Sequence, residues 1–191
     1  MTSRPPIAMH CYAVLRLGIF CGERRELISE HPTMRLKLIE LLVSVWRLSW
    51  QDRLLLMEAF LYMAIAGFAV AVLPFRHVGR LAARPIRGPE LPLETRVNKV
   101  RRIRWAIIAT GSRVPWRAVC LQQGLAAQLM LRRRNIPSVL YYGAAQDRGG
   151  LSAHVWVRDG NVDVIGGEIA HRFAALAAFP PSHGYVGSAN V

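Results

Sequence analysis

The sequence predicts an α+β fold in which helices come first and an antiparallel sheet follows. Apolar residues recur at helical spacing over much of the chain up to residue 134. After Pro137 the pattern changes to short runs of β-branched and aromatic residues with turn signals between them. The 191 residues are 52% hydrophobic and 19% charged, which is enough apolar material for a packed core and excludes global disorder.

Four segments are expected along the chain. Residues 1–33 lack a clear period and are interpreted as an extension of uncertain order. Residues 34–93 are expected to form a helical region that ends in a basic, proline-rich linker. Residues 94–180 are expected to form the α+β core, and residues 181–191 form a loop-like tail.

Two helices are predicted in the second segment. Apolar spacing predicts the first over Leu36–Trp50, and a second over Arg53–Leu73 with Asp52 as its N-cap. Pro74 ends this helix, because proline lacks the N–H that the next turn needs. The residues that follow, 76–93, are rich in Arg and Pro and are interpreted as a linker.

The stretch Leu54–Leu73 is long enough to cross a bilayer, because it holds 20 residues with Glu58 as its one charge. An acid one turn inside a membrane span is costly. Basic residues flank both ends, so charge gives no orientation. We interpret the stretch as a fully buried core helix, with membrane or interfacial attachment as the alternative.

Two further helices precede the sheet. Glu94–Thr110 is basic and amphipathic. The next helix begins near Pro115 and runs through Cys120 to Arg134, and Asn135 is suited to the left-handed position that closes it.

Three strands are predicted after that helix, over Ser138–Tyr142, His154–Arg158 and Asn161–Ile165. The dipeptide Asp159-Gly160 between the last two indicates a two-residue hairpin turn. Residues 169–178 are rich in alanine and are expected to form a short helix.

Cys120 and His154 are the candidate catalytic pair. A thiol at a helix N-terminus feels the positive end of the helix dipole, which stabilises the thiolate. A histidine on a strand can act as the base for such a nucleophile. The alternative for each is structural: a small core cysteine and a packed histidine.

The third member of a triad is sought from the hairpin register. With Asp159-Gly160 as the turn, Trp156 faces Asp163 and His154 faces Ile165. Asp163 then lies diagonally next to His154 and can orient the imidazole. Glu168, beyond two glycines, is the reserve candidate if the hairpin contains a bulge.

The charge balance points to an acidic partner. The chain has 25 Lys and Arg against 12 Asp and Glu, a net charge of +13. Such a surface favours nucleic acid, anionic lipid or an acidic peptide. No basic motif is interleaved with aromatic residues, so no nucleic-acid partner is expected.

The sequence indicates neither a metal nor a cofactor. Three cysteines without a CxxC pair predict neither a disulfide framework nor a structural zinc site. No phosphate-binding GxxxxGK[ST] loop is present, and no cofactor is expected. The first residues do not resemble a secretory signal, so a cytoplasmic protein is expected, with membrane association left open.

Two segments carry a resemblance to transglutaminase-like cysteine enzymes. Residues 119–143 (VCLQQGLAAQLMLRRRNIPSVLYYG) resemble the nucleophile segment of these enzymes. Residues 153–168 (AHVWVRDGNVDVIGGE) resemble their His-x-Trp-Val strand and the following strand with its acid. Within the superfamily, the pattern most resembles the leader peptidases of lasso-peptide biosynthesis.

This resemblance implies a papain-like peptidase. Cys120 would attack the peptide carbonyl, His154 would shuttle the proton and Asp163 would orient His154. The backbone N–H of Cys120 would stabilise the oxyanion.

The resemblance also implies the substrate and the partners. The substrate would be a ribosomally made precursor peptide, and the partners a separate leader-recognition protein and a lasso cyclase. Two alternatives remain: a transglutaminase-type acyl transferase, and a non-catalytic basic adaptor at a membrane.

Overall fold

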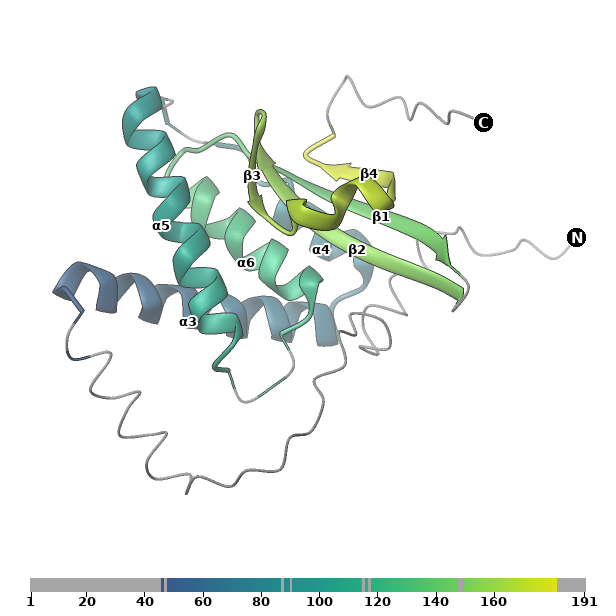
Figure 1. The fold of residues 1–191 in the computed structure, drawn as a ribbon, viewed down its shortest axis with the longest axis horizontal. Coiled ribbons are helices and arrows are strands. Elements are labelled where there is room, and N and C mark those ends of the chain that lie inside the picture. Colours follow the sequence, from purple (N-terminus) through teal and green to yellow (C-terminus); the bar gives the residue numbers. More distant parts are fainter. Residues whose placement is uncertain are drawn as a thin grey trace, which may run out of the picture.

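The structure is a computed structural model that describes residues 46, 48–86, 88–89, 91–114, 116, 118–147 and 150–181. Within these residues four helices come first and four strands follow, with a 3₁₀ helix before the last strand (Figure 1). The elements are α3 Trp50–Val72, α4 Phe75–Ala82, α5 Leu93–Gly111, α6 Cys120–Arg133, β1 Val139–Asp147, β2 Gly150–Asp159, β3 Val162–Ile165, η1 Gly167–Arg172 and β4 Ala174–Phe179. The predicted α+β class is confirmed. Most of the helix expected over Leu36–Trp50, the extension 1–33 and nearly all of the tail lie outside the described residues, and Trp50 begins α3 instead of ending the earlier helix.

Helix α3 differs from its prediction in two ways. Its N-cap is Ser49 rather than Asp52, and the Ser49 side chain accepts a hydrogen bond from the Asp52 N–H at 3.2 Å. It is also not fully buried. Ala59, Met63 and Ala66 are completely inaccessible on its inner face, whereas the outer face is open to solvent.

Two secondary-structure predictions are wrong. The expected linker 76–93 begins with helix α4, whose inner residues Val78 and Ala82 are buried in the core. The expected helix over 169–178 is instead η1 followed by strand β4. Pairing of β4 with β1 supplies backbone hydrogen bonds that override the helical preference of its alanines.

The four strands form one antiparallel sheet in the order β3-β2-β1-β4. The predicted register of the β2–β3 hairpin is wrong. Asp159 pairs with Val162, so the loop between them is Gly160-Asn161, and Gly160 has a φ of 57°. The register also shifts between Val157 and Arg158, and such a bulge moves every later pair by one position.

The two faces of the sheet have different coverings. Helix α6 packs on the face that carries Val155, because a Cβ on Gly124 would lie 2.6 Å from the Val155 Cγ1 atom. Segment η1 joins β3 at one edge to β4 at the other, so it must cross β2 and β1 (Figure 1). The central strands are therefore enclosed, and residues 153–157 of β2 are all buried.

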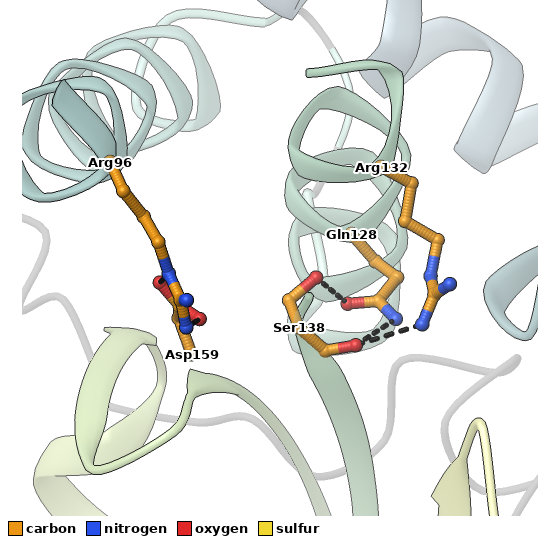
Figure 2. A network of polar contacts seen from close by, with 5 residues as sticks. All are labelled: Arg96, Gln128, Arg132, Ser138 and Asp159. Carbon is orange, nitrogen blue, oxygen red and sulfur yellow. Dashed lines mark hydrogen bonds and ion pairs between the residues drawn. The ribbon is translucent and has the colours of Figure 1, made fainter. Parts of the chain in front are cut away.

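Polar contacts tie the helices to the sheet (Figure 2). The guanidinium of Arg96 on α5 forms an ion pair with Asp159 at the hairpin tip. The Gln128 amide on α6 is completely buried and accepts a hydrogen bond from the Ser138 hydroxyl at 2.8 Å. The Arg132 guanidinium donates to the Ser138 carbonyl at 2.9 Å.

Candidate active site

Cys120 is the first residue of α6, so the helix begins five residues after the predicted start near Pro115. Val119 is the N-cap residue, with an extended φ and ψ of −69° and 159°. The Cys120 side chain is partly buried and packs against the hydrophobic core. The first amides of a helix have no partner within that helix, so the Cys120 N–H can stabilise negative charge near the thiol.

His154 lies in the middle of β2 and is only 5% exposed. Its Nε2 atom is 2.7 Å from the Gly166 carbonyl oxygen. A carbonyl can only accept a hydrogen bond, so Nε2 carries the proton and Nδ1 is the basic atom of the neutral ring. The ring stacks on Trp156 and tilts against Phe173, with centroid distances of 6.1 and 5.0 Å.

The side chains of His154 and Val155 point to opposite sides of β2. Successive side chains of a strand point to opposite faces, and Val155 faces α6, so His154 faces away from it. The contacts of the ring with Gly166 and Phe173 place it beside the connection that carries η1.

Asp163 does not lie next to His154. Because the loop is Gly160-Asn161 rather than Asp159-Gly160, Asp163 lies opposite Arg158, and its carboxylate forms an ion pair with the Arg158 Nε at 2.8 Å. Four residues along β2 separate Arg158 from His154, or about 13 Å at 3.3 Å per residue. The geometric reason for choosing Asp163 is therefore wrong, and its catalytic role stays a prediction without that support.

The negative charge of Glu168 favours the protonated form of the His154 ring. Burial lowers the pKa of His154, while the hydrogen bond to Gly166 and the negative charge of Glu168 oppose that shift. The pKa of Glu168 is lowered, mainly by its own backbone N–H and then by the guanidinium of Arg104, with which it forms an ion pair. Arg104 also donates to the Val164 carbonyl at 3.2 Å, so helix α5 anchors the segment that holds His154.

Comparison with known proteins identifies the family. Residues 63–178, more than half of the chain, match the family model described as Transglutaminase-like superfamily. The chain belongs to the transglutaminase-like superfamily. Comparison with curated proteins and with solved structures found no significant match.

Membership in the transglutaminase-like superfamily is consistent with a cysteine-dependent enzyme of the papain-like kind. The matched region contains Cys120, His154, Asp163 and Glu168. Among the described residues of this transglutaminase-like chain, no group of three or more His, Cys, Asp and Glu side chains is arranged to hold a metal ion.

Two elements of the site were missed by sequence reasoning. The Gly166 carbonyl and the Arg104 guanidinium both support the histidine side of the site. A backbone carbonyl leaves no trace in residue type. The signal that could have indicated it is the glycine pair after β3, since Gly166 has a φ of 72°, a left-handed conformation that favours glycine.

Proposed function

We propose that the protein is a cysteine peptidase that removes the leader from a ribosomally made precursor peptide in lasso-peptide biosynthesis. The observation that carries the proposal is a cysteine on the first turn of the central helix of a transglutaminase-like core. The resemblance of residues 119–143 and 153–168 to lasso leader peptidases supplies the substrate class.

In this proposal Cys120 is the nucleophile and His154 is the general base. The Cys120 thiolate attacks the carbonyl carbon of the scissile peptide bond, and the Cys120 N–H stabilises the oxyanion. His154 gives a proton to the leaving amine, and the thioester is then hydrolysed by water. Nδ1 is the atom of His154 available for this transfer, because Nε2 is bound by Gly166.

Contacts with Gly166 and Phe173 hold the His154 ring in place. Catalysis in this proposal requires the Nδ1 atom of this ring to lie within hydrogen-bond reach of the Cys120 thiol when substrate is bound.

The partners in this proposal are the precursor peptide, a separate leader-recognition protein and the lasso cyclase. The expected location is the cytoplasm. The supporting argument is chemical: Cys120 needs a reduced thiol, which a reducing compartment maintains.

The test is the mass of the precursor peptide after incubation with variants of the full chain. We expect Cys120→Ala to abolish leader removal, and His154→Ala to reduce it by about two to four orders of magnitude. Cys21→Ala is the matched control, because it removes a thiol outside the superfamily match and should retain the wild-type rate.

Three outcomes would contradict the proposal. Full turnover by Cys120→Ala would favour the non-catalytic adaptor. A product carrying an added amine in place of water would favour the acyl transferase, which the superfamily name also allows. Full turnover by His154→Ala would show that His154 is not the general base.

A further inference from the structure

The outer face of α3 carries a continuous apolar stripe. Its members recur every three or four residues, as positions on one side of a helix do, and each is 43% to 70% exposed. The stripe comprises Leu54, Met57, Leu61, Ile65, Phe68 and Val72. At 1.5 Å per residue it is about 27 Å long. A soluble surface rarely leaves so long an apolar row uncovered.

The stripe presents no charge. The sequence from residue 54 to residue 73 contains one ionisable acid or base, Glu58. The Glu58 carboxylate is turned away from the stripe to Arg134, at 2.5 Å, and its side chain is only 16% exposed. The helix thus buries its one charge in an ion pair and leaves its apolar side chains in solvent.

A groove widens this apolar surface toward α5. It has a volume of about 1060 Å³ and lies between the two helices, with Met57, Phe60 and Trp105 among its apolar lining. Its charged lining consists of Arg53, Arg113 and the ion pair between Glu58 and Arg133, whose atoms lie 3.3 Å apart. Within the described part of the chain, neither Arg53 nor Arg113 forms an ion pair with a carboxylate. Arg53 donates to the Leu48 carbonyl and Arg113 to the Ala109 carbonyl, which hold the two guanidinium groups in place but leave their positive charge without a carboxylate beside the apolar floor.

We propose that this face of α3 binds the surface of an anionic lipid bilayer. An amphipathic helix lies in the interface with its apolar side in the acyl boundary and its cations at the headgroup phosphates. Tryptophan side chains favour that level, and Trp50 and Trp105 lie at the groove. The net charge of +13 adds a long-range attraction to an anionic leaflet.

The helix lies on the membrane rather than crossing it. α3 has the length and composition of a membrane span, but its inner residues Ala59, Met63 and Ala66 are completely buried in the domain core. Crossing would expose that core to lipid and would separate α3 from α5 and α6. The bilayer is favoured over a protein partner because the cations flank an uncharged stripe without a complementary set of acids. This inference does not depend on the proposed peptidase activity.

The experiment is vesicle flotation of the full chain. Vesicles that contain phosphatidylglycerol should carry the protein upward, and vesicles of phosphatidylcholine alone should not. Binding should fall at about 1 M salt, where the Debye length is about 3 Å. Met57→Glu with Leu61→Glu should lower the bound fraction at least tenfold, because it places carboxylates in the stripe. Arg53→Gln with Arg113→Gln should remove much of the salt-dependent part of the vesicle binding.

The matched control is Val162→Glu with Leu176→Glu, two exposed apolar residues on the sheet. It should float like the wild type, and the thermal unfolding of every variant should match the wild type. Equal flotation on both lipids, or equal flotation by the Met57/Leu61 variant, would overturn the proposal. A self-associated chain that the same substitutions dissociate would also overturn it, because a second copy would then cover the face.

Discussion

His154 links the candidate site to the pH dependence of folding. Burial lowers its pKa, so the folded protein holds the ring neutral at a pH where the unfolded chain already binds a proton. The stabilising contribution is present above the unfolded value of about 6.5 and is lost as pH falls from there toward the folded pKa. We expect the free energy of unfolding to fall through this range by at most about 1.4 kcal/mol per pH unit.

Urea unfolding at several pH values would measure this loss. His154→Gln should remove that part of the pH dependence, because glutamine does not titrate there. His171→Gln, a change on the exposed part of η1, is the control for removing one histidine. Parallel pH curves for the wild type and His154→Gln would show that another group is responsible.

The pH dependence of turnover should also distinguish the two candidate acids, Glu168 and Asp163. Glu168→Gln removes the negative charge that opposes the lowering of the His154 pKa. The acidic limb of the pH–rate profile should therefore move to lower pH, and turnover should fall about tenfold, less than the ~10⁴-fold loss of a triad acid. Asp163→Asn should have a smaller effect, because Asp163 pairs with Arg158.

This order is the reverse of the one that the sequence predicts. Cleavage rates of the two variants, measured side by side across pH, would decide between them. If Asp163→Asn is the slower enzyme and shifts the acidic limb, the active conformation brings Asp163 to the imidazole after all.

At the residue scale, the sequence predicted which element carries each candidate residue better than it predicted which side chains touch. Cys120 at a helix start follows from the change of pattern around it, and His154 on a strand follows from its β-branched neighbours. The position of Asp163 depends on where the hairpin turns, and the loop lies one residue later than predicted, at Gly160-Asn161. Composition around a Gly-containing turn does not determine such a shift, and one residue is enough to change every pair beyond it.

At the element scale, Gly143 in β1 allows strand β4 and the Trp156 ring to approach β1 closely. A Cβ on Gly143 would lie 2.8 Å from the Ala174 carbonyl oxygen and 2.8 Å from the Trp156 ring. Neither group can move freely, because one is the backbone of β4 and the other belongs to a buried side chain. Gly143→Ala should therefore cost about 1–3 kcal/mol of folding free energy by overpacking.

Chemical denaturation would measure that cost. Ala145→Ser, at a half-exposed position of the same strand, is the control and should change the free energy of unfolding by less than about 0.5 kcal/mol. A Gly143→Ala protein as stable as the wild type would mean that β4 shifts away from β1 at little cost.

The elements that the sequence predicted incorrectly are those set by tertiary contacts. Residues of β4 have a helical composition and become a strand because β1 offers an edge. Helix α4 follows Pro74 directly, since proline is permitted at the start of a helix although it ends the previous one. By contrast, α5 agrees with its predicted bounds within one residue, because its own amphipathic pattern determines it.

At the scale of the whole molecule, the proposed peptidase should depend on a second protein. All four described strands belong to one sheet, and the described residues form no separate leader-binding module. We expect slow cleavage by the chain alone and a rate about 10²-fold higher when the recognition protein delivers the precursor to Cys120.

Initial rates at fixed precursor concentration, with and without the recognition protein, would test this dependence. A precursor without its leader is the control and should gain nothing from the partner. Equal rates in the presence and absence of the partner would contradict the expected delivery.

The Gln128 amide has a consequence for how the molecule opens. Its Nε2 atom lies 3.0 Å from the carbonyl oxygens of Ala82, Ser138 and Phe179. These three carbonyls come from the end of α4, the start of β1 and the end of β4, which are distant in sequence. The amide has two N–H donors, so detaching two of these segments would leave a buried donor without an acceptor, and we expect the three segments to open together. Slow hydrogen exchange in β4 should therefore persist to the end of the strand instead of fraying residue by residue.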